Sequence, residues 1–173
     1  GTPLVILSNV GEDGNVVPDD HRLNMVHKAN SLWHSDSSFK PTPALASMLS
    51  AKTVPPEGGE TEYASMIVAW DDLPKDTKAK IDGKIALHHF AASRNRINPE
   101  LMTQAEYDEL PPVKQIMVRD IPETGKKSLY VGSHAGAIVG MPDDEAKQLI
   151  DELVAFATAP ERVYTHTWRA NDV

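Results

Sequence analysis

The pattern of apolar and polar positions predicts several short strands separated by turns. Strands are predicted where residues alternate in polarity, or form a short apolar run, between turn-forming residues. Five segments meet this description: Leu4–Leu7, Leu32–Phe39, Thr61–Ala69, Ile85–Phe90 and Arg162–Trp168. Two more, Gln115–Arg119 and Ser128–Val131, flank a Pro-Glu-Thr-Gly sequence that is typical of a hairpin turn.

Helical periodicity is clearest near the end of the chain, in Asp143–Ala157. One face of this segment is apolar and consists of Ala146, Leu149, Ile150, Leu153, Val154 and Ala157. Shorter helices are predicted at Pro43–Leu49 behind a Thr42 cap, from Asp72-Leu73-Pro74 to a stop at Gly83, and after the capping box that begins at Thr103. Strands interrupted by helices predict a β-rich α+β domain, a sandwich or barrel with helices packed outside it.

Length and composition fit one globular domain, residues 1–173, with an ordinary apolar fraction of 40%. The chain carries 17 Lys and Arg against 25 Asp and Glu, a net charge of −8, which disfavours nucleic acids and anionic membranes as partners. The absence of Cys excludes disulfides and thiolate metal sites. No run approaches the roughly 18 apolar residues that span a bilayer, and no signal-peptide pattern opens the chain, so a cytoplasmic location is expected.

Candidate metal chemistry lies in the segment Leu32–Phe39. On a strand, alternate side chains share a face, so His34 and Asp36 would point the same way and could meet at one metal ion. A third, distant His would complete the two-His, one-carboxylate site of non-haem iron oxygenases, which leaves coordination positions open. The spacing alone is common by chance, and a solvated surface His–Asp pair is the alternative interpretation.

The sequence around this pair resembles the taurine dioxygenase family, and within it the 2,4-dichlorophenoxyacetate dioxygenase branch. Four segments carry the resemblance in the same order: Asn30–Phe39, Pro55–Tyr63, Val118–Ala135 and Tyr164–Val173. The resemblance implies a double-stranded β-helix (jelly roll) with flanking helices, and a dioxygenase that uses Fe(II), 2-oxoglutarate and O₂. His34 and Asp36 then take two metal-ligand positions, and Thr61 the position that bonds a carboxylate of 2-oxoglutarate.

Three further residues are candidates for the substrate site. Asn30 matches a substrate-contacting position of the family, with a turn-forming Asn as the alternative. His134 falls where the herbicide-enzyme branch has a His near the substrate, and otherwise is a structural His. His89 would line the substrate pocket, with His88 on the opposite face of the same strand. His166 is a poor third metal ligand, because the family's distal His comes later in the sequence.

The family's distal metal His and its 2-oxoglutarate-binding Arg are expected beyond Val173, and part of its N-terminal region is expected before Gly1. The domain is therefore expected to be partial, and the chain inactive by itself. The intact protein would hydroxylate a small anionic organic substrate, aryloxyalkanoate-like or sulfonate-like, while 2-oxoglutarate is converted to succinate and CO₂. A homo-oligomer is expected, as is common in the family. Two alternatives are a non-catalytic jelly-roll protein that binds a metal or ligand, and a metal hydrolase.

Overall fold

The computed structural model describes residues 5–11, 13–18 and 21–173. Their helices and strands follow one another in this order: α1 (Arg22–Asn30), β1 (Thr61–Ala64), α2 (Met66–Asp72), α3 (Lys75–Ile81), β2 (Ile85–His88), α4 (Phe90–Asn95), α5 (Gln104–Glu109), β3 (Val113–Ile116), β4 (Val118–Ile121), β5 (Lys126–Leu129), β6 (Ala135–Ile138), α6 (Asp143–Ala157), the 3₁₀ helix η1 (Pro160–Arg162) and β7 (Val163–His166). No helix among them is long and apolar enough to cross a membrane.

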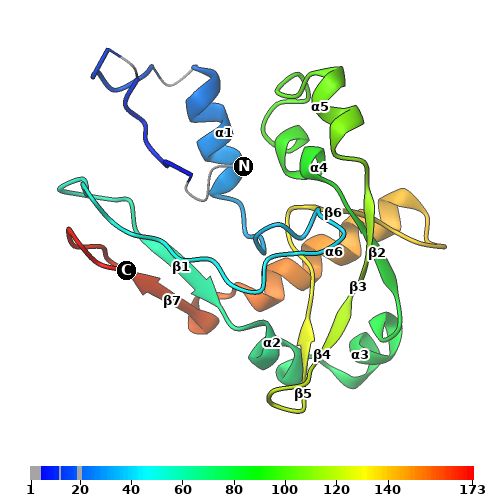
Figure 1. Ribbon diagram of the computed structural model, residues 1–173. Coiled ribbons are helices and arrows are strands. Elements are labelled where there is room, and N and C mark those ends of the chain that lie inside the picture. Colours follow the sequence, from blue (N-terminus) through cyan, green and yellow to red (C-terminus); the bar gives the residue numbers. More distant parts are fainter. Residues whose placement is uncertain (1–4, 12, 19–20) are drawn as a thin grey trace.

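The described strands form three small antiparallel sheets (Figure 1). The central sheet has the order β3-β2-β6, β4 pairs with β5 in a hairpin, and β1 pairs with β7. The hairpin continues the central sheet through Met117, whose amide donates to Lys84 O at 2.9 Å and whose carbonyl accepts from Tyr130 N at 2.7 Å. The α+β class is confirmed. Helices hold more of the described residues than strands do, so the β-rich part of the prediction does not hold for them.

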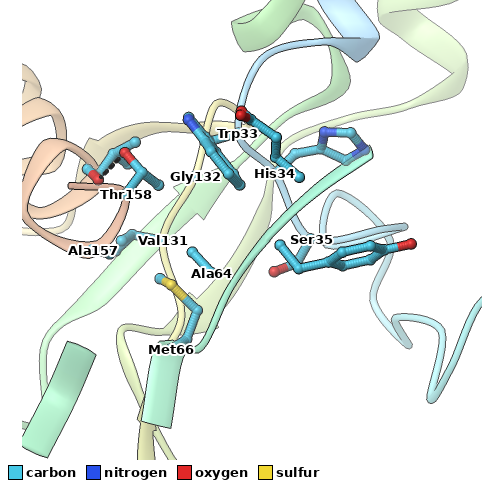
Figure 2. Close-up of a pocket in the computed structure, with 12 residues that line it drawn as sticks. Trp33, His34, Ser35, Ala64, Met66, Val131, Gly132, Ala157 and Thr158 are labelled. Carbon is cyan, nitrogen blue, oxygen red and sulfur yellow. Dashed lines mark hydrogen bonds between the residues drawn. The ribbon is translucent and has the colours of Figure 1, made fainter. Parts of the chain in front are cut away.

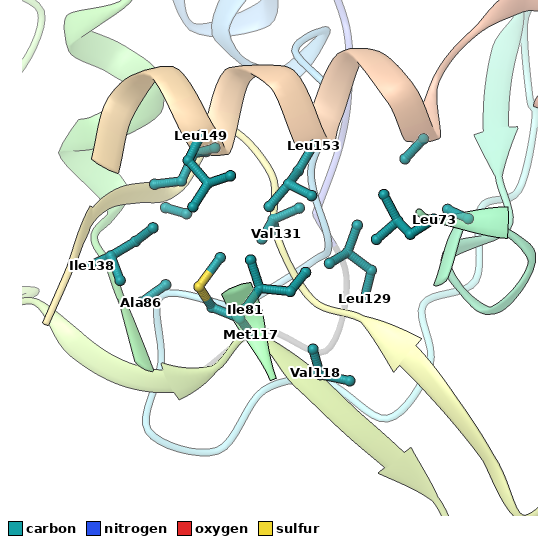
Figure 3. Packing of buried hydrophobic residues seen from close by; sticks show 14 of the residues in the cluster. Leu73, Ile81, Ala86, Met117, Val118, Leu129, Val131, Ile138, Leu149 and Leu153 are labelled. Carbon is teal, nitrogen blue, oxygen red and sulfur yellow. The ribbon is translucent and has the colours of Figure 1, made fainter. Parts of the chain in front are cut away.

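Helix α6 packs against the sheets and contributes five buried residues to the core, Ala146, Leu149, Ile150, Leu153 and Ala157. Its residues Leu149 and Leu153 point toward Ile81, Met117 and Leu129, and all five side chains are at most 4% exposed (Figure 3). The predicted helix agrees with the observed one at both ends. Local apolar periodicity is a sufficient guide here because the whole face is buried against one surface.

Several local predictions are confirmed. Thr103 and Glu106 form the reciprocal capping box of α5. The helix predicted before Gly83 is α3, and Gly83 adopts φ 74°, a conformation that stops a helix and favours glycine. The predicted hairpin is present as β4 and β5, and Arg162–Trp168 contains β7.

The strand predicted at Leu32–Phe39 is wrong. The segment is a loop with tight turns, in which Ser38 N donates to Ser35 O at 3.3 Å and Lys40 N donates to Ser37 O at 2.9 Å. Ser37 itself lies in the left-handed region with φ 57°. Alternating polarity over a serine-rich stretch does not distinguish a strand from turns, because serine side chains and turn amides compete with sheet pairing.

The helix predicted at Pro43–Leu49 is also absent, and the segment has no regular structure. Leu45 is fully exposed and Met48 is 87% exposed, so no core face stabilises a short helix there.

Two predicted strands are shorter in the structure, and a third is not observed among the described residues. Thr61–Ala69 is a strand only as far as Ala64, because Ser65 caps the following helix α2 by accepting from Val68 N at 3.3 Å. Ile85–Phe90 ends as a strand at His88, and α4 begins at Phe90. Of Leu4–Leu7, Leu4 lies outside the described residues and residues 5–7 are not a strand.

Candidate metal centre

His34 and Asp36 lie side by side at the surface of the loop that carries them. The distance from His34 Nε2 to Asp36 Oδ1 is 3.1 Å, and the two side chains are 28% and 54% exposed. The other ring nitrogen, His34 Nδ1, is 2.6 Å from the carbonyl oxygen of Leu32. Since a carbonyl oxygen only accepts, Nδ1 carries a hydrogen, and Nε2 is the ring nitrogen that faces the carboxylate.

This arrangement fits a metal ion. A lone pair and a carboxylate oxygen repel each other unless a cation lies between them, and a divalent metal or a proton on Nε2 serves that purpose. Imidazole nitrogens and carboxylate oxygens bind transition metals at about 2.0–2.2 Å, so two such donors at a right angle are about 3 Å apart. A backbone carbonyl that fixes the other ring nitrogen is a usual partner of a metal-bound His. No group of three His, Asp or Glu side chains that could hold a metal occurs among the described residues.

The loop is held against the segment that joins β5 to β6. Ser133 N donates to Trp33 O at 2.8 Å. A Cβ atom on Gly132 would lie only 3.1 Å from both His34 Cα and Trp33 O. Such a close approach of two backbones favours glycine, so Gly132 allows the His34 backbone to pack closely on the segment after β5.

His134 is buried directly beneath the loop, at 4% exposed. Its Nδ1 lies 3.2 Å from the buried Ser38 Oγ, and its ring contacts the rings of His34 and Phe39 at centroid distances of 5.5 and 4.9 Å. Burial, followed by the nearby charges of other basic groups, lowers the pKa of His134 to about 3, although Asp36 acts in the opposite direction. His134 is therefore neutral near neutral pH and is joined to the loop that carries His34 and Asp36 by contact and hydrogen bonding.

Asn30 is fixed by a buried cation. Arg94 Nη2 donates to Asn30 Oδ1 at 2.6 Å, and Arg94 Nη1 donates to Ser93 Oγ at 2.7 Å. The guanidinium lies 3.8 Å from the centroid of the Phe90 ring and is 4% exposed. Burial lowers the pKa of Arg94 from its ordinary value. With its oxygen occupied, the Asn30 side chain has its amide N–H groups left to offer.

Thr61 begins β1 and lies opposite His166 of β7. Its Oγ1 accepts a hydrogen bond from Trp168 Nε1 at 2.8 Å, which leaves the hydroxyl hydrogen available for an acceptor such as a carboxylate. His166 contacts the Trp168 ring at a centroid distance of 4.4 Å and lies 3.5 Å from Asp172 Oδ2. The side chain of His166 thus contacts residues that follow β7, Trp168 and Asp172.

His89 and His88 have different surroundings. The His89 ring lies against Tyr107 of α5 at 5.3 Å, and its backbone N–H donates to His134 O at 2.8 Å. Burial lowers the pKa of His89, and a hydrogen bond from its ring to the backbone of Leu110 acts in the opposite direction. The structure therefore joins His89 to His134 through the backbone, while the side chain points at α5. The role of His89 in a substrate pocket stays a prediction.

His88 is 1% exposed and stacks on Tyr130 at 5.4 Å, with neither ring nitrogen in a hydrogen bond of good geometry. Burial, and then the charge of Arg119, lower the pKa of His88 to about 4 from 6.5. The native protein therefore holds this ring neutral, whereas the unfolded chain takes up a proton below pH 6.5.

We expect the free energy of unfolding to fall as the pH is lowered from 6.5 toward 4. The His88 contribution amounts to about 1–2 kcal/mol at pH 5.5. Urea unfolding at pH 7.5 and 5.5, compared with a His88→Phe variant that keeps the stack on Tyr130, measures it. The variant should lose less stability between the two pH values than the parent, and equal losses would contradict this assignment.

A small cavity of about 130 Å³ lies behind the loop (Figure 2). Trp33, His34 and Ser35 form one side of it, and Ala157 and Thr158 from the end of α6 lie opposite Ser35. The remaining lining residues come from β1, α2, the segment after β5 and α6: Glu62, Tyr63, Ala64, Met66, Val131, Gly132 and Val154. Neither Asn30 nor His134 lines it. The cavity therefore connects the His34 loop with the strand that begins at Thr61.

Sequence reasoning missed three residues of this region: Ser38, Gln115 and Gly132. Gly132 carried a usable signal, since a glycine after a strand indicates a close backbone approach. Ser38 and Gln115 carried none, because their burial at 2% and 6% arises from contacts with distant residues.

Comparison with known proteins identifies the family. The sequence model of the family described as "Taurine catabolism dioxygenase TauD, TfdA family" matches residues 7–173. The chain belongs to this family. The resemblance expected from the sequence is thus confirmed.

Individual TauD/TfdA relatives are similar along almost the whole chain. An alpha-ketoglutarate-dependent 2,4-dichlorophenoxyacetate dioxygenase of Burkholderia sp. (strain RASC) is 41% identical over 98% of this chain and 57% of its own length. An (S)-phenoxypropionate/alpha-ketoglutarate-dioxygenase of Sphingobium herbicidovorans is 34% identical, over 98% of this chain and 62% of its own length. The crystal structure of AAD-2 with Mn(II) and N-oxalylglycine superposes with a TM-score of 0.89 at 43% identity, covering 95% of this chain and 60% of that one. The chain therefore spans about three fifths of these relatives.

Proposed function

We propose that the protein is a non-haem Fe(II)- and 2-oxoglutarate-dependent dioxygenase with a jelly-roll fold. One observation carries the proposal: in a chain of the TauD/TfdA family, His34 Nε2 and Asp36 Oδ1 are 3.1 Å apart, with the ring held by Leu32 O so that Nε2 faces the carboxylate. These two side chains supply two of the three protein donors of a facial triad. The match to AAD-2 bound to Mn(II) and N-oxalylglycine supports the same assignment.

Each candidate site residue of this chain would then have a separate role. Bound Fe(II), with 2-oxoglutarate as cosubstrate, supplies the O₂ chemistry needed for hydroxylation. Thr61 donates its hydroxyl hydrogen to a carboxylate of 2-oxoglutarate, since its oxygen already accepts from Trp168. His134 packs against the His34 ring and, because burial keeps it neutral, places no positive charge beside the metal. Asn30 offers N–H groups to the substrate, because Arg94 occupies its oxygen.

The substrate we propose is a small organic anion, with aryloxyalkanoates first. The two relatives described above are named for 2,4-dichlorophenoxyacetate and (S)-phenoxypropionate, and a third, from Pseudomonas putida, is named an alpha-ketoglutarate-dependent sulfate ester dioxygenase at 28% identity. Asn30 and the buried Arg94 behind it offer N–H donors and positive charge, which suit an anion.

A substrate panel tests this function. The purified intact protein, with the third metal ligand that this chain lacks, is incubated with Fe(II), O₂ and 2-oxoglutarate, and succinate is measured with aryloxyalkanoates, alkyl sulfonates or sulfate esters present. We expect at least one aryloxyalkanoate to raise the rate of succinate formation about 10-fold or more above the rate without it, as correct substrate positioning does.

Two controls separate the alternatives. Omission of 2-oxoglutarate or O₂ should stop product formation, and turnover that continues without them would indicate a metal hydrolase instead. Metal binding without succinate for any compound would indicate a non-catalytic protein of the same fold.

A further inference from the structure

We propose that Gln115 is a positioning residue of the candidate metal centre, because its side chain fixes the loop that carries His34 and Asp36 on the sheet. The inference rests on the proposed function, since it takes these two side chains as metal ligands. Gln115 lies on β3, far from them in sequence, and is 6% exposed. Its side chain reaches the loop from the sheet below.

The Gln115 amide makes three hydrogen bonds, and each of them determines its orientation. Its Nε2 donates to the carbonyl oxygens of Ser38 and Lys40, at 3.0 Å each. Its Oε1 accepts from Arg119 Nη2 at 2.9 Å. Because carbonyl oxygens only accept and a guanidinium only donates, a flipped amide would lose all three bonds. Both hydrogens of the NH₂ group are thus used on the loop.

Arg119 holds the amide in turn. Its guanidinium carbon lies 3.5 Å from the centroid of the Tyr130 ring, whose other ring contact is the buried His88. Tyr130 itself is 9% exposed, so this stack belongs to the interior of the sheet. Arg119 is therefore an oriented donor, and Gln115 transmits its position to residues 38 and 40.

The loop depends on such external bonds because it has no regular structure of its own. Its first half is tied by the bond from Ser133 N to Trp33 O, at 2.8 Å. Its second half is tied by the two Gln115 bonds and by the contact between Ser38 Oγ and His134 Nδ1, at 3.2 Å. Asp36 lies between the two anchored halves, so the separation of its carboxylate from His34 depends on both.

The test compares two variants of adjacent residues on β3 that change the charge by the same amount. Gln115→Glu keeps the shape of the side chain but replaces the two N–H donors with an oxygen that faces two carbonyl oxygens. Lys114→Gln, at an exposed position, also changes the charge by −1 and makes no loop contact. Co(II) is titrated into the metal-free protein. Its visible absorption gives both the Kd and the geometry of its donors.

We expect Gln115→Glu to raise the Kd for Co(II) about 10-fold, as does loss of a residue that orients metal ligands, and to alter the visible spectrum. Amide hydrogen exchange in residues 34–40 should become faster while β3 keeps its protection. Lys114→Gln should leave the Kd, the spectrum and the exchange unchanged.

Three outcomes would overturn the inference. The first is parent-like Co(II) affinity and spectrum in Gln115→Glu, and the second is an equal loss of affinity in Lys114→Gln, which would make the effect one of charge. The third is a globally unfolded Gln115→Glu by circular dichroism, because the residue would then hold the domain rather than the loop. A His34→Ala variant separates the two proposals. If it binds Co(II) like the parent, the metal site and this inference both fall, whereas weak binding by His34→Ala with normal binding by Gln115→Glu overturns only the role of Gln115.

Discussion

His34→Ala should lower both the affinity for Co(II) and the rate of succinate formation by more than about 100-fold. Loss of groups that merely orient a metal ligand costs about 10–100-fold, so loss of a ligand itself should cost more. The remaining carboxylate of Asp36 is 54% exposed to solvent, so after the substitution this chain offers the ion one solvated donor in place of a pair. Both quantities are measured on the same preparation, by Co(II) titration and by succinate formation with Fe(II), O₂ and the best compound of the panel.

Asp36→Ala should produce a loss of the same size, because each residue supplies one donor. His27→Ala is the matched control. His27 lies on α1, and its Nε2 is 2.9 Å from Ser8 O, with no contact to the loop. Its replacement should leave metal affinity and succinate formation within about 2-fold of the parent, as is usual for substitutions away from a site. A His34→Ala variant that retained the parent's Co(II) affinity would refute the site.

The candidate metal pair could be predicted from sequence, but for a reason that the structure corrects. Strand alternation predicts that His34 and Asp36 share one face, whereas the structure brings the two side chains together in a loop that turns directly after His34 and Ser35. A separation of two residues can be closed by either geometry. The identity of the pair therefore survives an error in local structure, because it depends on residue chemistry and on the family resemblance more than on backbone shape.

The elements that could be predicted are those whose stability is local. Helix α6 shows its buried face in its own periodicity, and α5 shows its cap in four residues. The segment Pro43–Leu49 has the same kind of local signal, yet Leu45 and Met48 find no surface to pack against. Isolated short helices are unstable in water. The helix is absent because its apolar side chains are not buried by the rest of the fold, and the local sequence does not show whether they will be.

The supports of the site were the least predictable part. Gln115 sits in a predicted strand, where a polar residue normally faces solvent, and nothing nearby in sequence indicates that two carbonyl oxygens of the loop satisfy it. The same holds for the contact between Ser38 and His134, which are far apart along the chain. Such bonds arise only when the sheet brings distant segments together.

Gly132→Ala should destabilise the protein by about 1–3 kcal/mol, the usual cost of overpacking. The added Cβ would lie 3.1 Å from His34 Cα and from Trp33 O, and both atoms belong to the backbone, which cannot rotate away as a side chain can. Relief requires the loop to move off the sheet by a few tenths of an ångström. That movement would stretch the bond from Ser133 N to Trp33 O and displace His34 from Asp36. We therefore expect the affinity for Co(II) to fall about 10-fold as well.

Gly136→Ala is the matched control, since it adds the same methyl group four residues later. A Cβ there would meet only Ala92 Cβ, at 3.4 Å, an ordinary contact. Urea unfolding of the two variants gives the difference in stability, and Co(II) titration gives the difference in affinity. If both variants lost equal stability, the effect would belong to glycine flexibility in general. If Gly132→Ala lost stability but kept its Co(II) affinity, the loop could move without disturbing the pair, and the close packing of His34 on Gly132 would serve the fold rather than the metal.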